Sequence, residues 1–168
     1  MPAEAPDDLA LLLDFATTPA DEALLSTAYL GRQTARDWSR EGNFTSARDR
    51  LLECITLIEG IATPAPAPEV SISSSLFMEF CGSLRADLAR VMWELGADET
   101  KLVTLLDEAR KYYEGSASSS GVVTCWCLAA DIYADSGDLS EAAECVRRAL
   151  RAGGYTSLQQ GSRVATEQ

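Results

Sequence analysis

Apolar residues recur along most of this chain at steps of three and four residues, a spacing that gathers side chains on one face of an α-helix. Strict alternation of β-branched and polar residues, which is typical of half-buried strands, is nearly absent. The prolines fall outside the strongly periodic segments. The pattern therefore predicts an all-α protein.

Capping residues predict where the first long helix begins. Thr18 is a hydroxyl cap, Pro19 suits the first helical turn, and Asp21 and Glu22 place negative charge at the positive end of the helix dipole. This helix should extend to about Arg40.

Glycine followed closely by Asn or Asp predicts the later turns, at Gly42-Asn43, Gly96-Ala97-Asp98 and Gly137-Asp138. Glycine adopts the left-handed conformation that ends a helix, and Asn or Asp caps the next helix. A long helix is expected from roughly Ser74 to Leu95, and Gly153-Gly154 should end the last one.

Each predicted helix has an apolar face that we expect to be buried. These faces comprise Leu9, Leu12, Leu13, Phe15, Phe44, Ala47, Leu51, Cys54, Ile55, Ile58, Leu84, Leu88, Val91, Leu95, Leu102, Leu105, Leu106, Ala109, Tyr113, Trp126, Ala129, Ala130, Tyr133, Ala142, Val146, Ala149 and Leu150.

Two segments interrupt the periodicity. Residues 62–68 alternate Pro and Ala and should form a stiff extended connector, whereas the serine-rich run 115–121 is predicted to be a flexible loop. The predicted organisation is an acidic segment with a short capping helix (1–18), a helical-repeat domain (19–156) with hairpins at about 19–60, 74–114 and 121–154, and a polar tail (157–168).

The helix–glycine–helix unit occurs three times, and the last copy has a specific pattern. It consists of Trp126, Ala130, Tyr133, Gly137, Ala142, Ala149 and Leu150. At this spacing the chain resembles the tetratricopeptide repeat (TPR) family, over most of residues 24 to 154. The same spacing is also compatible with an ordinary helical bundle, because small residues are needed wherever two helices pack closely.

The other two units match the repeat less well. In the first unit Ala35, Trp38, Gly42, Asn43, Ala47 and Leu51 fit the family pattern. Gly31 stands there in place of a large residue, and Cys54 in place of an alanine. In the middle unit Leu88, Ala89 and Gly96 fit, but Leu102 replaces an alanine and the turn has one extra residue. The closing proline of the family is missing throughout.

The resemblance implies both a fold and a function. The implied fold is a short right-handed solenoid of about three helical hairpins with an N-terminal capping helix. The implied function is non-catalytic: a partner segment binds in the concave groove lined by the first helix of each hairpin. Size and repeat number are also similar to those of secretion chaperones, so adaptor and chaperone roles both stay open.

Composition narrows the function classes. With 26 acidic and 14 basic side chains the 168-residue chain has a net charge of −12, which disfavours nucleic acids and anionic membranes as partners. It has no histidine, so Ser-His and Cys-His catalytic pairs and the usual histidine-containing zinc centres are excluded. We therefore expect neither an enzyme nor a bound cofactor or metal.

The cysteines and the first residues suggest a location. Five cysteines, an odd number, sit in apolar segments, which is not typical of a secreted disulfide framework. Those of Cys125-Trp126-Cys127 are two positions apart, so on a helix they point in different directions and are expected to be buried and chemically inert, with Trp126 in the core. The N-terminus lacks the pattern of a signal peptide. We expect a cytoplasmic protein.

A stripe of arginines is the candidate site. Arg32, Arg36 and Arg40 recur every fourth residue, and such like-charge pairs cost a helix about 0.2–0.5 kcal/mol each, so a counter-charge from elsewhere is expected. By the repeat alignment, Arg32 and Arg36 face the groove with Tyr29 beside them and Arg90 at the matching place in the middle hairpin.

The predicted partner is a protein segment that is acidic, carries a C-terminal carboxylate, or has mixed charge. Guanidinium groups bind carboxylates bidentately. The same surface of the last hairpin carries Asp131 and Asp135, so the groove would be basic at one end and acidic at the other.

Three alternatives stay open. The arginines could pair with acids of a neighbouring helix, or the acidic segment from Glu4 to Asp14 could fold back into the groove. The chain could instead be a structural subunit or a homodimer that uses an apolar helical edge, with Phe77, Met78 and Phe80 as candidate exposed residues.

Overall fold

The computed structural model describes residues 7–61 and 72–154, and these form seven helices and no strands. The all-α prediction is confirmed. The helices are α1 (Asp7–Leu13), α2 (Pro19–Arg40), α3 (Phe44–Glu59), α4 (Ile72–Glu94), α5 (Glu99–Gly115), α6 (Ser119–Asp135) and α7 (Leu139–Ala152). The predicted Pro-Ala connector and the polar tail from 157 lie outside the described residues.

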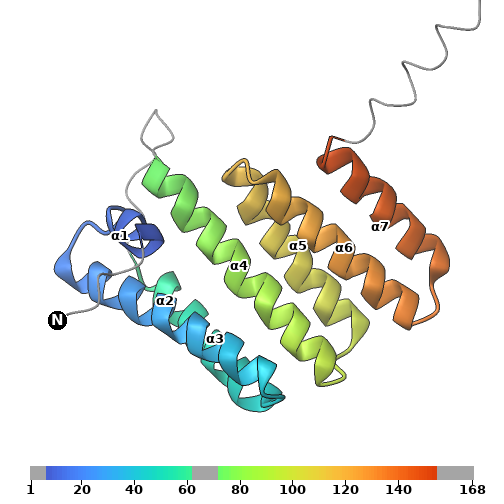
Figure 1. Ribbon diagram of the computed structural model, residues 1–168, viewed down its shortest axis with the longest axis horizontal. Coiled ribbons are helices and arrows are strands. Elements are labelled where there is room, and N and C mark those ends of the chain that lie inside the picture. The colour runs from blue at the N-terminus through green and yellow to red at the C-terminus, as the bar shows by residue number, and fades with distance from the viewer. Residues whose placement is uncertain (1–6, 62–71, 155–168) are drawn as a thin grey trace, which may run out of the picture.

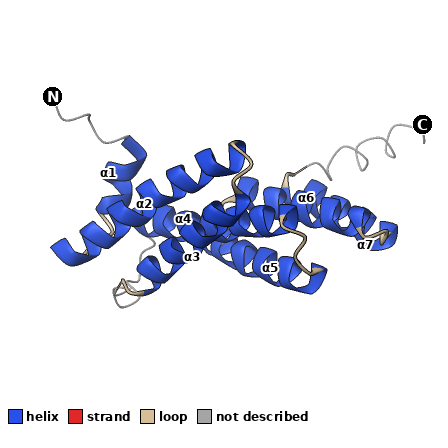
Figure 2. Cartoon of the chain, turned by 90° about the horizontal axis from the view of Figure 1, so that it is seen from below, coloured by secondary structure: helices blue, strands red, loops and turns tan. Residues whose placement is uncertain are grey.

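The six long helices pack as three adjacent pairs, α2 with α3, α4 with α5 and α6 with α7 (Figure 1). The first helix of each later pair packs on the second helix of the pair before it: α4 packs on α3, and α6 packs on α5. Seen from below, α2, α4 and α6 form one layer and α3, α5 and α7 the other (Figure 2). We call these the first-helix layer and the second-helix layer.

The two layers differ in how closely their members approach. In the first-helix layer α4 comes close to both α2 and α6. In the second-helix layer α3, α5 and α7 do not come close to one another. The first-helix layer is therefore the narrower side of the array.

The predicted turns are confirmed, and so are three of the caps; Asp98 stands at the N-cap position of α5, but its side chain makes no capping hydrogen bond. The side chains of Thr18, Asn43 and Asp138 each accept a hydrogen bond from the backbone N–H three residues later. The turn residues Gly42, Gly96 and Gly137 all have positive φ, at 79°, 74° and 87°. The α4–α5 turn has the expected extra residue, since Ala97 separates Gly96 from the N-cap Asp98.

The prediction of a flexible loop over 115–121 is wrong. Helix α5 continues to Gly115, α6 begins at Ser119, and Ala117 takes the left-handed turn position with a φ of 57°. The N–H of Ser118 donates to Tyr113 O at 2.9 Å, and the Ser118 hydroxyl caps Gly121 N. Serine acts here as a helix cap, so the connection is as tight as the glycine turns.

The core consists of two clusters that share α4. Leu84 and Leu88 of α4 face the first cluster with α1, α2 and α3, and Ala86 and Ala89 face the second with α5, α6 and α7. Helix α4 is thus buried on two faces.

Some predicted core positions are wrong. Leu95 is 40% exposed, because it follows α4 in the turn, and Val146 and Leu150 are each 47% exposed. In α7 the side that faces α6 carries Ala142, Cys145 and Ala149, so positions 146 and 150 point away from the only described helix that packs on α7. Most of the other predicted core residues are buried and the rest half-buried.

The prediction that Phe77, Met78 and Phe80 form an exposed apolar edge is also wrong. Phe77 and Phe80 are buried in the first cluster, and Met78 is half-buried. The Phe77 ring stacks on Phe15 at 4.1 Å between centroids, so α1 and the turn after it cover this part of α4.

Candidate partner-binding groove

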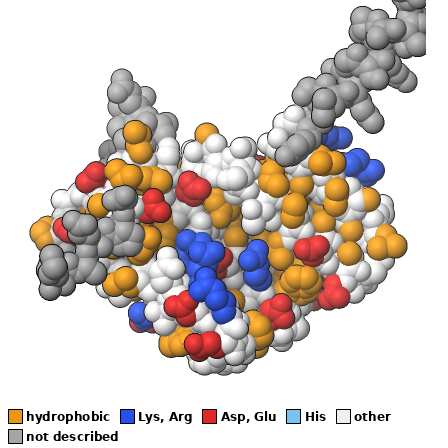
Figure 3. Space-filling model, in the orientation of Figure 1, with side chains coloured by type: hydrophobic (Ala, Val, Ile, Leu, Met, Phe, Trp, Pro, Cys, Tyr) orange, Lys and Arg blue, Asp and Glu red, His pale blue; other side chains and the backbone are white. Residues whose placement is uncertain are grey.

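Two surface cavities of about 340 and 370 Å³ lie between α2 and α4 and share Arg36 in their walls. We call them together the arginine groove. Its lining includes five of the predicted site residues: Tyr29, Arg32, Arg36, Arg40 and Arg90. Figure 3 shows basic side chains gathered near the middle of this face of an otherwise acidic molecule.

Asp87 of α4 supplies the counter-charge that the arginine stripe requires. Its Oδ2 atom accepts a hydrogen bond from Arg32 Nε at 2.8 Å and lies 3.7 Å from Arg36 Nε. The prediction that the arginines pair with a neighbouring helix is confirmed for these two residues. One carboxylate therefore pairs with two guanidinium groups, so these three side chains together carry a net positive charge.

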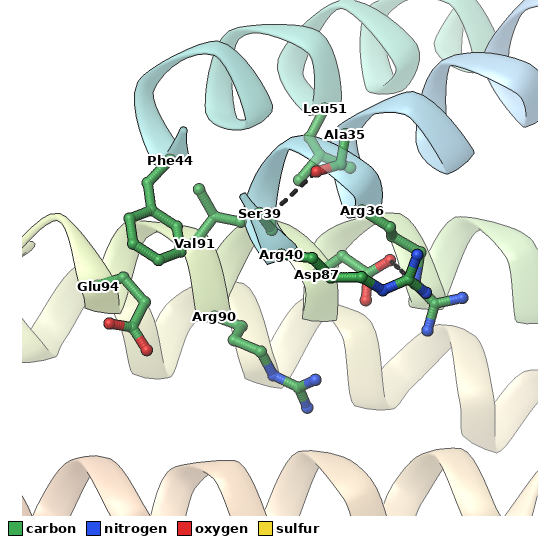
Figure 4. Close-up of a pocket in the computed structure, with 10 residues that line it drawn as sticks. All are labelled: Ala35, Arg36, Ser39, Arg40, Phe44, Leu51, Asp87, Arg90, Val91 and Glu94. Atoms are coloured by element: carbon green, nitrogen blue, oxygen red, sulfur yellow. Dashed lines mark hydrogen bonds and ion pairs between the residues drawn. The ribbon is translucent and has the colours of Figure 1, made fainter. Parts of the chain in front are cut away.

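The other two arginines of the groove are less engaged. Arg40 pairs with Asp37 of its own helix at 2.6 Å, and its side chain is 72% exposed. Arg90 is exposed, points away from Asp87 (Figure 4), and has no ion pair with any residue in 7–61 or 72–154. Glu94 is the further acid in this cavity, and Asp8 and Glu79 line the other cavity of the groove. An incoming anion would thus meet guanidinium groups not already saturated.

The groove also has an apolar part. The Tyr29 ring stacks loosely on Phe80, with centroids 6.0 Å apart, and Leu76 and Leu12 line the same cavity. In the other cavity Phe44, Leu51 and Val91 form the apolar surface. A ligand with carboxylates beside apolar side chains would match this lining.

Helix α1 lies against α2 and α4 at one end of the groove. Leu9 and Leu12 are buried there, and Asp8 lines the cavity that contains Arg32 and Arg36. The N-terminal segment is thus held by apolar contacts rather than by an ion pair between described residues. Residues 4–6, which belong to the predicted internal ligand, lie outside the described part.

Asp131 and Asp135 do not join the arginine groove. Both are exposed on α6, and Asp135 Oδ2 accepts a hydrogen bond from Trp93 Nε1 of α4 at 3.3 Å. Asp131 has no ion pair with a described residue. They form a separate acidic surface on the same helix layer.

Sequence reasoning missed two arginines that join neighbouring helices. Arg85 of α4 is only 6% exposed, donates to Glu59 at 3.1 Å, lies 3.6 Å from Glu108 and sits over the Tyr112 ring. Its position between the predicted core residues Leu84 and Leu88 was the available signal. The pairing of one arginine with two acids is the reverse of the arrangement at Asp87.

Arg110 of α5 is the second, and with Arg148 of α7 it flanks Trp126. Their guanidinium groups lie 4.1 and 4.9 Å from the ring centroid. Trp126 is half-buried between two guanidinium groups, so the prediction that it lies in the buried core is wrong.

The cysteines show little reactive character. All five are free; Cys54, Cys81, Cys125 and Cys145 are buried, whereas Cys127 is exposed, contrary to prediction. Burial raises the pKa of Cys81 and of Cys125 to about 12, so these thiols stay protonated and are poor nucleophiles.

Residues 7–61 and 72–154 lack two features that would point to other functions. They contain no group of three or more acidic or cysteine side chains placed to hold a metal ion. None of their helices combines the length and the hydropathy that crossing a membrane requires.

Comparison with known proteins does not assign the chain to a family. No protein-family model matches the chain, and neither the curated proteins nor the solved structures contain a significant match to it.

Proposed function

We propose that this chain is a short right-handed TPR-like solenoid that acts as a non-catalytic protein-interaction module. Three features of the fold support this architecture: helices pack in consecutive pairs, glycine turns join the helices of each pair, and the first helices approach one another while the second helices do not. The last feature is expected if the first-helix layer lines the concave side of a solenoid.

The function is binding of an acidic segment of a partner protein in the arginine groove. The observation that carries this proposal is that Arg32 and Arg36 share the single carboxylate of Asp87 while Arg90 has no described partner. Elsewhere Arg85 and Arg110 each have two carboxylates. Arg147 and Arg148 of α7 also share one, that of Glu144, but they lie outside the groove. The lining of the whole groove is balanced in charge, but the cavity with Arg36, Arg40 and Arg90 contains only two acids, Asp87 and Glu94. In a chain with a net charge of −12, this local cluster of arginines favours a ligand that brings its own carboxylates.

The best ligand has acids at one end and bases at the other. Its carboxylates would contact Arg36 and Arg90, and basic residues further along would face Asp131 on α6. A C-terminal carboxylate would supply one of the anions. Such a module fits an adaptor or a chaperone, and five free thiols fit a reducing compartment such as the cytoplasm.

The test uses labelled synthetic peptides of three kinds, acidic, basic and neutral, each made with a free C-terminal carboxylate and with an amide. Fluorescence anisotropy at low ionic strength should show that the wild-type protein prefers acidic peptides, and that added salt weakens binding. The Arg36→Glu/Arg90→Glu variant should bind them about tenfold more weakly or worse, because the charges now repel. Arg32 is left unchanged because its bond to Asp87 joins α2 to α4.

A matched variant controls for net charge. Arg48→Glu/Arg151→Glu changes the total charge equally but lies on α3 and α7 outside the groove, so it should retain wild-type affinity. Equal binding by both variants, or no preference for acidic peptides, would contradict the proposed function.

A further inference from the structure

The two cavities of the arginine groove differ in chemistry. Both contain Arg36, but only the cavity of about 340 Å³ contains Arg40 and Arg90, and we call it the Arg90 cavity. The other, of about 370 Å³, contains Tyr29, and we call it the Tyr29 cavity. A ligand that fills both cavities must therefore pass Arg36.

The charges that line the Tyr29 cavity balance one another. The basic side chains are Arg32 and Arg36, and the acidic ones are Asp8 of α1 and Glu79 of α4. Arg32 is bonded to Asp87 at 2.8 Å and its side chain is only 17% exposed, so little of its charge faces a ligand. This lining favours a neutral side chain over a charged one.

The Tyr29 cavity also offers more apolar surface than the Arg90 cavity. Tyr29 and Leu76 are half-buried in its wall, and Leu12 and Phe80 are buried behind them. Among the described residues of the Arg90 cavity, Phe44 is the only large apolar side chain that is not buried. Burial of a large apolar side chain of a ligand is therefore most favourable beside Tyr29.

Helix α1 completes the Tyr29 cavity. It packs on α2 and α4 and contributes Asp8 and Leu12 to the lining, whereas α2 and α4 form the other two walls. No residue of α1 lines the Arg90 cavity. Sites for whole small-molecule ligands have volumes of about 300–1,000 Å³, so a cavity at the lower end of this range has room for one large side chain.

We propose that the acidic partner segment is held at two points, with an acidic residue in the Arg90 cavity and a large apolar side chain such as leucine in the Tyr29 cavity. This inference rests on the function proposed for the arginine groove. It adds a selectivity that charge alone does not provide, and it gives α1 a role in binding.

The helices that line the cavities set the spacing of the two anchors. The lining residues of the two cavities are centred about five residues apart on α2 and about eleven apart on α4, which corresponds to about 8 and 16 Å. An extended peptide advances about 3.3 Å per residue. The apolar anchor should therefore lie about two to five positions from the acid, with three or four as the best spacing.

Labelled peptides of glycine and serine test the spacing. Each contains a pair of glutamates and one leucine, placed one to eight positions away on either side, and the reference peptide has serine in place of the leucine. In fluorescence anisotropy, leucine three or four positions away on one side should raise the affinity about tenfold over serine. Leucine next to the acids, or eight positions away, should give no gain.

A neutral substitution tests the assignment to the Tyr29 cavity. Leu76→Gln removes apolar surface from its wall without changing the charge, so it should abolish the gain from leucine and leave the affinity for the serine peptide unchanged. Leu30→Gln is the matched control, since Leu30 is exposed on α2 outside both cavities, and it should bind like the wild type. Circular dichroism checks that both variants are folded, and the peptide series itself requires neither.

The possible failures are distinguishable. If acidic peptides bind but leucine gives no gain at any spacing, the two-point inference is wrong and the proposed function stands. If no acidic peptide binds, both are wrong. A gain from leucine that survives Leu76→Gln would place the apolar anchor elsewhere. A preference for lysine over leucine at the anchor position would show that Asp8 and Glu79 select the side chain, which also contradicts the inference.

Discussion

The two ends of the helix array are finished in different ways. At the N-terminal end, α1 and the turn after it pack on α2 and α4, with Leu12 and Phe15 buried and Phe15 stacked on Phe77 of α4. At the C-terminal end, α7 buries small residues and leaves Leu139, Val146 and Leu150 exposed. The first end therefore has an additional helix packed on it, and we call it the closed end; no described helix covers α7, and we call that end the open end.

This difference predicts which helices should open most readily. In a linear array each helix is stabilised by its neighbours, and a terminal helix has fewer of them. Helix α4, with core residues on both sides, should be the last to open. Helix α7, which among the described helices packs on α6 alone, should be among the first.

The largest predicted effect tests the closed end. Phe15→Ala should lower the free energy of unfolding by about 3 kcal/mol, because it removes a buried aromatic ring and its stacking contact with Phe77. Leu150→Ala at the open end should change it by about 0.5 kcal/mol or less. Urea denaturation followed by circular dichroism in dilute, monomeric samples measures both. Similar losses for the two variants would remove the distinction between the ends.

The second prediction concerns how closely the helices of the open half approach one another. A Cβ atom at Gly121 of α6 would overlap the ring of Tyr113, which is buried on α5. Gly121→Ala should therefore destabilise the protein by about 2 kcal/mol. Gly115→Ala is the matched control, since there the added Cβ meets only the flexible end of Met78. If both substitutions were neutral, the small residues of this half would not hold the helices close.

Much of the fold could be predicted from sequence, because caps and turn residues act locally. Thr18, Asn43, Asp138 and the turn glycines were predicted correctly for that reason. The 115–121 turn was not, because Ala117 adopts a conformation that alanine rarely takes and only the surrounding hydrogen bonds reveal it.

What could not be predicted depends on contacts between distant segments. Periodicity placed Val146 and Leu150 on an apolar face but could not show that no described helix packs on that side of α7. The arginine stripe indicated a missing counter-charge, yet Asp87 as its source follows only from the packing of α2 beside α4. Likewise Gly31 and Cys54 each depart from the repeat pattern, but a Cβ on Gly31 would clash with the Cys54 sulfur, so the two departures compensate each other.

A third prediction concerns a property that the two halves share. Burial raises the pKa of Cys81, in the first cluster, and of Cys125, in the second, from 9.0 to about 12. Above pH 9 the unfolded chain loses these protons while the folded chain keeps them, so the free energy of unfolding falls as the pH rises towards 12. For each of the two thiols the loss should be about 1–2 kcal/mol by pH 10.

Urea midpoints at pH 7, 9 and 11 measure this loss. The Cys81→Ala and Cys125→Ala variants should each show a smaller fall from pH 9 to pH 11 than the wild type, by similar amounts. An unchanged fall in either variant would show that its thiol does not contribute, and would make the two halves differ in this property as well.

The smallest predicted effect lies in the open half, at the turn between α5 and α6. Ala117 has a φ of 57°, where a side chain is unfavourable and glycine is not, and the neighbouring turns have glycine at this position. Ala117→Gly should therefore stabilise the protein by about 0.5–1 kcal/mol, because relief of strain exceeds the entropy that glycine adds to the unfolded chain. Gly137→Ala, the reverse change at the α6–α7 turn, should destabilise it by about 1 kcal/mol, since the turn has the same hydrogen-bond pattern and open space around the added Cβ. Opposite signs in the two urea midpoints would show that the turns are equivalent and that only the residue differs. A loss of stability in Ala117→Gly would mean instead that the Ala117 methyl group contributes contacts that outweigh its strain.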